Sequence, residues 1–328
     1  MADDQITIGV LGPGDEAAFE AFLMPHLASS MFLLGNVRRA GIVDTGERFS
    51  GTYVGAFGGG EMVGAVGHFW NGALMCQVPE PYTDAYLDPL WREAVRVSGR
   101  PIKGVFGPDE QAVRIQSALE MPAEIVQINH REKLYDLALA DLVVPGPLAS
   151  AKVGARLATQ DDLETLVLWR VGYETETMGE EDTAEYRADV RQRIARLIGD
   201  GTVWVLVRDG VAVATTGFNA VLGEVVQVGG VYTPPEHRCR GYARAAVAGS
   251  LLAMREGLGP VAEGHGGIPA PATDGASRAI LFTADSNIPA QKAYESLGFR
   301  QVGYFRLCLL WEGARIVSPQ SRSQGPGS

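Results

Sequence analysis

The feature that most constrains this chain is a strand that stops at two prolines and is followed by a short loop and a helix. The apolar, β-branched run at residues 224–232 predicts the strand, and the proline pair at 234–235 ends it because proline cannot donate to a sheet. Apolar residues then recur at helical spacing from about 241 to 256. This order is typical of sheets whose helices pack on their faces.

The start of this predicted helix has the properties of an anion-binding site. The first N–H groups of a helix lack backbone partners and carry partial positive charge. Gly241 leaves room for a ligand to approach the backbone, and Ala243 is nearly as small. Arg238, Arg240 and Arg244 add positive charge around it. The pattern favours a diphosphate ligand, and an ordinary turn with solvated arginines is the alternative.

A second helix with a distinctive pattern lies at residues 287–299, which read NIPAQKAYESLGF. Asn287 is a predicted N-cap, Pro289 suits the first turn, and Gly298 suits the C-terminal end. Tyr294 lies near the apolar face of this helix. The plain alternative is a capped helix in which Tyr294 only packs.

The elements around these segments predict a mixed sheet with helices. From residue 152 onward the pattern predicts the order β-α-α-β-β-β-α-β-α-β-β, with Asp209-Gly210 as a hairpin turn. The first half of the chain shows the same order more faintly, which suggests a duplication. We therefore expect an α/β fold with two domains, each a mixed, mostly antiparallel sheet flanked by helices.

Composition predicts where these domains divide. A stretch rich in proline and glycine at residues 143–150 predicts the boundary, which gives domains at 1–148 and 149–316. The remaining residues, 317–328, are rich in Ser, Gln, Gly and Pro and are expected to form a disordered tail. The segment 257–275 shows neither helical nor strand periodicity, so we expect a long loop there.

Together and in this order, the two segments resemble the GNAT superfamily of N-acetyltransferases. The loop resembles the family's [Gln/Arg]-x-x-Gly-x-[Gly/Ala] motif, and the helix resembles its Asn-x-x-Ala-x-x-x-Tyr-x-x-x-Gly-Phe motif. The residues that carry these two motifs are Arg238, Gly241 and Ala243, then Asn287, Ala290, Tyr294, Gly298 and Phe299. The resemblance covers residues from about 153 to 311, and the tandem layout is similar to GNAT proteins with a degenerate N-terminal copy.

The resemblance implies acetyl-CoA (coenzyme A) as cosubstrate and a set of residues that hold it. The exposed backbone of Val231, Tyr232 and Thr233 would pair with the pantetheine arm, where the strand splays from its neighbour. Asn287 would bind the pantetheine region, and Tyr294 would protonate the leaving thiolate. The pyrophosphate would be held by the loop and helix start, which comprise Arg238, Cys239, Arg240, Gly241, Tyr242, Ala243 and Arg244.

Transfer to an amine also requires a base, because an amine is mostly protonated at neutral pH. Glu224, on the strand before the loop, is the first candidate. Gln227 cannot act as a base and could at most order a water molecule. Glu174 and Glu176, between two predicted helices, could face the acceptor, and His237 is a weaker candidate.

Composition argues against several other classes of function. Three separated cysteines and five histidines without ligand spacing predict neither a disulfide framework nor a metal site. The net charge of −11, concentrated in residues 1–150, argues against nucleic acid. No uninterrupted apolar run is long enough to span a membrane, and the acidic residues 1–4 do not read as a signal peptide. We expect a cytoplasmic protein, either a monomer or a homodimer.

The first domain lacks a matching loop, since residues 80–85 read EPYTDA and are acidic. We expect no cofactor there. The predicted function is an acyl-CoA-dependent N-acyltransferase that moves an acetyl group from acetyl-CoA to a primary amine by direct attack. The acceptor would be a small molecule, an amino acid or a peptide. A non-catalytic acyl-CoA-binding regulatory protein is the alternative, and a longer acyl chain or an oxygen acceptor is a third possibility.

Overall fold

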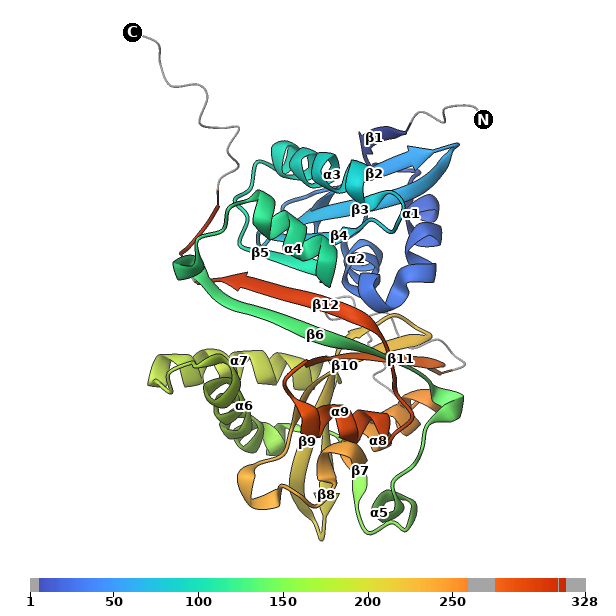
Figure 1. The fold of residues 1–328 in the computed structure, drawn as a ribbon. Coiled ribbons are helices and arrows are strands. Elements are labelled where there is room, and N and C mark those ends of the chain that lie inside the picture. The colour runs from blue at the N-terminus through green and yellow to red at the C-terminus, as the bar shows by residue number, and fades with distance from the viewer. Residues whose placement is uncertain (1–5, 259–274, 312, 317–328) are drawn as a thin grey trace. The chain divides into compact units, whose positions relative to one another are not determined.

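A computed structural model of the protein describes residues 6–258, 275–311 and 313–316. Most of the loop expected at 257–275 and the whole of the tail expected at 317–328 lie outside these described residues. The described chain forms two compact units (Figure 1).

Two long strands, β6 (Val126–Ala138) and β12 (Arg300–Leu310), mark where these units divide. The first unit comprises Met1–Lys133 and Gly303–Ser328, and the second comprises Leu134–Val302. Strand β6 therefore begins in the first unit and ends in the second, whereas β12 begins in the second and ends in the first. The units consequently divide the chain at other residues than the proline-rich stretch suggested.

The first unit is a mixed sheet in the order β1-β2-β3-β4-β5-β12 with helices packed on it. Its first four strands pair antiparallel, β4 and β5 pair in parallel, and β12 pairs antiparallel with β5. Its strands before β6 are β1 (Thr7–Val10), β2 (Gly51–Gly58), β3 (Glu61–Phe69), β4 (Ala73–Gln77) and β5 (Gly104–Pro108). Its helices are α1 (Glu16–Leu23), α2 (Leu27–Ala40), α3 (Thr83–Ser98) and α4 (Asp109–Ala118).

The second unit repeats this order of elements in the sheet β6-β11-β10-β9-β8-β7. Its strands are β7 (Gly154–Leu157), β8 (Val203–Arg208), β9 (Val211–Val221), β10 (Val225–Tyr232) and β11 (Arg278–Ala284). Its helices are α5 (Gly146–Ala149), α6 (Leu163–Met178), α7 (Ala184–Gly199), α8 (Tyr242–Arg255) and α9 (Ile288–Glu295). Both units therefore have the same order of elements, and the predicted fold class of mixed sheets flanked by helices is confirmed.

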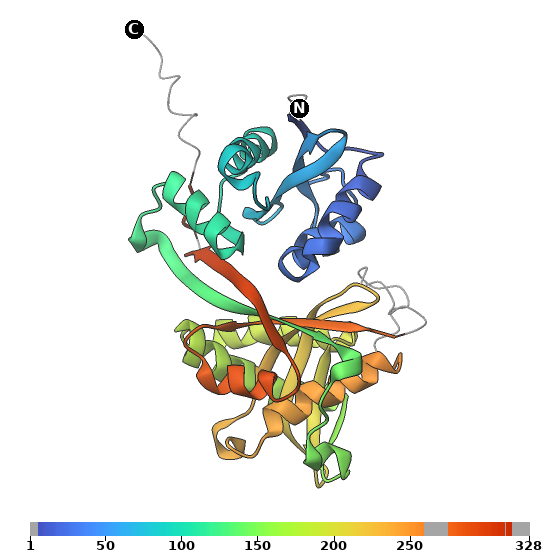
Figure 2. The same cartoon turned by 45° about the vertical axis from the view of Figure 1, so that its right-hand side comes forward.

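Alternation along β8 shows how helices cover both faces of the second sheet. Trp204 packs in a core cluster with residues of α8 and α9, whereas Val203 and Val205 pack with residues of α6 and α7. Successive side chains of a strand point to opposite faces, so the two helix pairs lie on opposite sides. Figure 2 shows α8 in orange and α9 in red on one face of this sheet.

At the end of each half of the sequence, one long strand is present where the sequence pattern predicts two separate strands. Residues 126–138 form the one strand β6, and residues 300–310 form the one strand β12. The strands predicted at 125–130 and 133–142 are separated only by Arg131 and Glu132, and those predicted at 301–305 and 307–311 only by Arg306. Neither break contains a Gly, Pro or Asn that would favour a tight turn. A continuous strand is therefore the locally consistent outcome.

One helical stretch of the first unit, Glu16–Ala40, is long and apolar enough to cross a membrane by length and composition alone. No such segment was expected from the sequence, because no uninterrupted apolar run is long enough to span a membrane. A core helix of a soluble protein passes the same test, and Phe19, Leu23 and Leu34 are fully buried within the structure.

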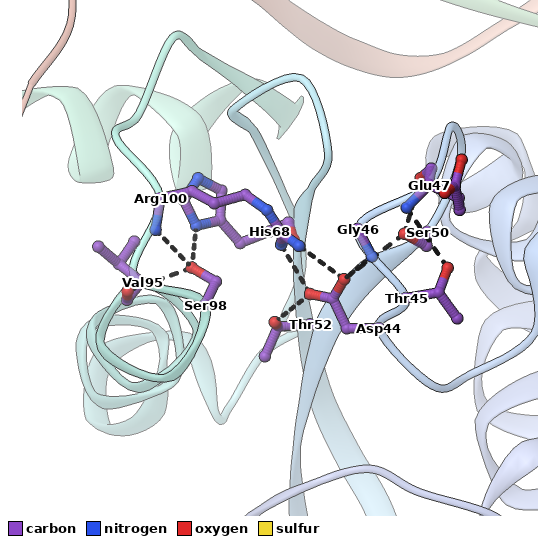
Figure 3. A network of polar contacts seen from close by, with 10 residues as sticks. All are labelled: Asp44, Thr45, Gly46, Glu47, Ser50, Thr52, His68, Val95, Ser98 and Arg100. Carbon is purple, nitrogen blue, oxygen red and sulfur yellow. Dashed lines mark hydrogen bonds and ion pairs between the residues drawn. The ribbon is translucent and has the colours of Figure 1, made fainter.

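A polar network around Asp44 holds the loop between α2 and β2 in the first unit (Figure 3). The Asp44 carboxylate accepts hydrogen bonds from both terminal nitrogens of Arg100, at 2.6 and 2.7 Å, and from the Thr52 hydroxyl at 2.6 Å. Burial raises the pKa of Asp44, but hydrogen bonds from Arg100 and Thr52 outweigh it and bring the pKa to about 2. His68 is fully buried beside this pair, with its Nδ1 atom 2.7 Å from the Ser98 hydroxyl.

Burial, assisted by the charge of Arg100, lowers the pKa of His68 to about 4 from 6.5. The unfolded chain therefore binds a proton at this residue at a higher pH than the folded chain does. Stability from His68 is complete above pH 6.5 and is lost as the pH falls toward 4, by roughly 3 kcal/mol in all. We expect His68→Asn, which cannot titrate, to remove this loss.

Urea unfolding of the wild type and His68→Asn at about pH 7 and about pH 4.5 measures this difference. Burial raises the pKa of Glu132 to about 7, so the contribution of Glu132 to stability increases as the pH falls, opposite to that of His68. Glu132 is present in both proteins, so its contribution cancels in the comparison. Equal losses of stability in the two proteins on acidification would show that His68 is not the titrating group.

Candidate active site

The parallel strands β10 and β11 pair over only part of their length. The paired residues run from Val225 with Arg278 to Val228 with Leu281. Both strands continue beyond these residues, to Tyr232 and Ala284, without further pairing to each other in the described chain. Backbone groups of β10 beyond Val228 are therefore open on this side to an extended ligand.

A β-bulge lies in β10 where the two strands part. On its other side, Gly229 pairs with Gly217 and Tyr232 with Thr215, so β10 contains one extra residue. Gly230 has a φ of 60°, a left-handed conformation that favours glycine. Val231 lies in this bulge, and Tyr232 and Thr233 follow it directly; all three were predicted to face the pantetheine arm.

The loop after β10 presents a row of backbone N–H groups. A short 3₁₀ turn, η5 (Pro235–His237), leads into residues Cys239 and Gly241, whose φ values of 60° and 74° are both left-handed. Within the described chain, none of the N–H groups of residues 239–244 has a backbone partner. Together with the start of α8, they form a concentrated site of partial positive charge.

The three arginines of this loop differ in their contacts. The Arg238 guanidinium binds the Glu176 carboxylate at 2.7 and 3.0 Å and donates to the Thr233 carbonyl at 3.0 Å, so it fastens the loop to α6. Arg240 and Arg244 are exposed. Arg244 folds back over Gly241, where an added Cβ would lie 3.0 Å from its Nε atom.

Tyr242 contributes its backbone to the loop and its side chain to the core. Its ring is buried with Leu206 and Val213, and its hydroxyl accepts a hydrogen bond from Arg208 at 2.6 Å. This hydrogen bond lowers the pKa of Tyr242. The neighbouring Cys239 is exposed to solvent.

Helix α9 starts at the same edge of the sheet, because β10 and β11 are parallel and their carboxyl ends lie together. Asn287 caps the helix, and its side-chain oxygen accepts the Ala290 N–H at 3.2 Å. Tyr294 is 8% exposed and packs in the cluster that includes Val228 and Leu281, the last paired residues of the two strands. The predicted cofactor residues and Tyr294 therefore lie around one edge of the sheet.

Glu224 does not lie at this edge of the sheet. It precedes β10, and its carbonyl accepts the N–H groups of Ser277 and Arg278 at 2.8 and 3.1 Å. At about 3.3 Å per residue, it is roughly 13 Å along the strand from Val228, where β10 and β11 part. The structure therefore does not bring Glu224 together with the other predicted residues.

The comparison with known families agrees with this geometry. Residues 153–300 match the family described as the acetyltransferase (GNAT) domain. These residues are a GNAT domain. The predicted family is therefore confirmed, and no curated protein matches the chain by sequence.

Two solved structures with TM-scores above 0.5 share this fold over nearly the whole chain. A GCN5-related N-acetyltransferase from Sphaerobacter thermophilus has a TM-score of 0.52 at 14% identity, with coverage of 97% of this chain and 98% of that one. A Drosophila protein has a TM-score of 0.56 at 11% identity, with coverage of 94% and 99%. A tandem GNAT protein from the clavulanic acid biosynthesis pathway has a TM-score of 0.49 at 12% identity, with coverage of 96% and 99%.

The GNAT domain also contains a buried ion cluster that connects α6 and α7. Glu174 is 2% exposed and accepts hydrogen bonds from Arg170 at 2.6 Å, from Arg193 at 3.0 and 3.2 Å, and from the Tyr186 hydroxyl. Burial raises the pKa of Glu174, but hydrogen bonding to Arg193 and the charge of Arg170 outweigh it and lower the pKa. Glu174 is thus held ionised with its oxygens occupied, which makes it a poor base.

The two arginines of this cluster, Arg170 and Arg193, were not among the residues predicted from the sequence. The spacing of Arg170 and Glu174, four residues apart on one helix, was a signal for their ion pair. Nothing local pointed to Arg193, which comes from α7. Among the described residues of the protein, no three His, Cys, Asp or Glu side chains are grouped as a metal site.

Proposed function

We propose that the protein is an acyl-CoA-dependent N-acyltransferase that moves an acetyl group from acetyl-CoA to a primary amine. The observation that carries this proposal is the row of N–H groups at 239–244, next to the edge where β10 and β11 part. The first feature suits a diphosphate and the second suits an extended amide chain. Coenzyme A combines these two chemical groups in one molecule.

The proposed mechanism assigns separate tasks to the backbone and to Tyr294. Acetyl-CoA supplies an activated acyl group, whose carbon–sulfur bond breaks when the amine nitrogen attacks directly. A backbone N–H of the open part of β10 donates to the carbonyl oxygen as it gains negative charge. Tyr294 donates its proton to the leaving sulfur, and the amine loses a proton to water or to a base.

The position of Glu224 favours a second candidate function, a non-catalytic acyl-CoA-binding protein. Glu224 lies away from the edge where the other residues gather, and Glu174 is occupied by three donors. A binding protein needs no base, whereas an enzyme must release the amine proton. Release of free thiol in the presence of an amine panel separates the two functions.

Protection of Cys239 provides a direct test of the cofactor site. All three cysteines are described, and Cys239 alone is exposed whereas Cys76 and Cys308 are buried. We expect saturating acetyl-CoA to slow the reaction of Cys239 with a maleimide roughly 10-fold, because the diphosphate would cover residues 239–244. Mass spectrometry of the labelled protein measures the rate at this single residue.

The matched control for this test is acetyl-pantetheine, which carries the same thioester but no diphosphate. It should protect Cys239 much less at equal concentration. Unchanged labelling with acetyl-CoA, together with no heat of binding at about millimolar concentration, would contradict the proposed function.

A further inference from the structure

Two adjacent glycines in the bulge of β10 leave one side of the strand without side chains. A Cβ added to Gly230 would have the Nη1 atom of Arg170 as its nearest neighbour, at 3.8 Å. The corresponding space at Gly229 is taken by the Asn219 amide, whose nitrogen would lie 2.1 Å from an added Cβ. Arg170 from α6 and Asn219 from β9 therefore both reach the backbone at which the acyl group would be transferred.

The Arg170 side chain is held in place by contacts that leave its terminal N–H groups available. Its Nε atom donates to buried Glu174 at 2.6 Å, and its guanidinium carbon lies 5.3 Å from the centre of the Tyr173 ring. Its two terminal nitrogens have no hydrogen-bond partner within the described chain, and the side chain is 30% exposed. A fixed guanidinium with two free terminal nitrogens matches the two oxygens of a carboxylate.

The charge balance of this cluster also favours an anion. Glu174 is shared by Arg170 and Arg193, so one buried carboxylate faces two guanidinium groups. Asp189, the other partner of Arg193, is exposed and its charge is screened by water. A carboxylate on the ligand would neutralise the remaining positive charge at Arg170.

Gln227 supplies a second, independent observation on the same strand. It is 2% exposed, and its Oε1 atom is buried without a hydrogen-bond partner. A buried acceptor without a donor is unfavourable, so such an atom marks a place where a ligand N–H or a water is expected. Gln227 precedes Gly229 by two residues, so both lie on the same face of β10.

We propose that the acceptor is an amine that carries a nearby carboxylate, as an α-amino acid does. Arg170 binds its carboxylate, and the Oε1 atom of Gln227 accepts a hydrogen bond from its amine. This inference rests on the proposed function, because it names the substrate class of the same site. Gln227 does not remove the proton; it positions the nitrogen.

The first test compares pairs of acceptors that differ only at the carboxylate. Each of several α-amino acids is assayed against its methyl ester and its decarboxylated amine, by thiol release from acetyl-CoA with the full chain. We expect kcat/KM to be on the order of 100-fold higher for the free carboxylate. Equal or better turnover of the esters and decarboxylated amines would overturn the proposal.

The second test uses Arg170→Gln, which removes the charge. It should raise KM for the amino acid about 10-fold or more and leave the acetyl-CoA Kd unchanged. Arg170→Lys should restore part of the effect, since it keeps the charge but loses the paired donors. Arg196→Gln, which removes an exposed charge from α7, serves as the matched control and should change neither value.

The outcomes separate this inference from the proposed function. If acetyl-CoA binds but no α-amino acid is acylated, the inference is wrong while the cofactor site stands. If Arg170→Gln raises KM equally for the amino acid and for its decarboxylated amine, Arg170 does not recognise the carboxylate. If acetyl-CoA itself does not bind, the proposed function fails and takes the inference with it.

Discussion

Replacement of Tyr294 by phenylalanine is expected to lower kcat by on the order of 100-fold or more, with the acetyl-CoA Kd nearly unchanged. The ring of Tyr294 packs edge-on against Phe299, 6.1 Å between centroids, and phenylalanine preserves that packing. Only the hydroxyl is lost, and with it the proposed proton for the leaving sulfur. Steady-state thiol release and calorimetry measure the two quantities.

Tyr135→Phe is the matched control for this variant. Tyr135 is fully buried in the same core cluster, and its hydroxyl donates to Glu295 at 2.9 Å. Its replacement should lower stability without a comparable loss of kcat. Full activity in Tyr294→Phe would remove Tyr294 from the mechanism, and a protein that binds acetyl-CoA but never turns over would favour the non-catalytic alternative.

Replacement of Gly241 by valine is expected to raise the acetyl-CoA Kd by roughly 10- to 100-fold, about 1.4 to 2.7 kcal/mol. Gly241 has a φ of 74°, which a β-branched residue adopts only with strain, and its added Cβ would meet Arg244 at 3.0 Å. Relief of this strain requires the loop to move, which disrupts the row of N–H groups at 239–244. Calorimetry with acetyl-CoA measures the change.

Gly210→Val separates loss of binding from loss of stability. Gly210 also has a left-handed φ, of 80°, but lies in the turn between β8 and β9 with no heavy atom within 4 Å of an added Cβ. It should lower the melting temperature through the same backbone strain and leave the acetyl-CoA Kd unchanged. Equal Kd values for the two variants would show that the loop at 239–244 does not hold the cofactor.

The element order of the second unit was predictable because its signals are local. The proline pair after β10, the Asp209-Gly210 turn and the Asn287 cap each act through the backbone of a few neighbouring residues. The cap is present in the structure, with the Ala290 N–H bound by Asn287, and Asp209 and Gly210 both have positive φ. Such features operate in the same way whatever the rest of the chain does.

The roles of individual side chains were less predictable because their partners are distant in sequence. Arg238 was assigned to the pyrophosphate, yet its guanidinium binds Glu176, 62 residues earlier in the chain. Glu224 was the first candidate base, but the register of β10 places it before the strand begins. The division into units also depends on long-range pairing, since the last strand pairs with β5 of the first unit.

By itself, the sequence determined a strand that ends at a proline pair, a short loop and a helix start with free N–H groups. These follow from local dihedral limits and from the backbone groups that a helix start leaves unpaired. Only the tertiary structure decided where β10 and β11 part, and that Arg170 stands over Gly230 while Gln227 is left without a donor. Strand register and helix packing set those positions, and both depend on contacts between residues that the sequence keeps far apart.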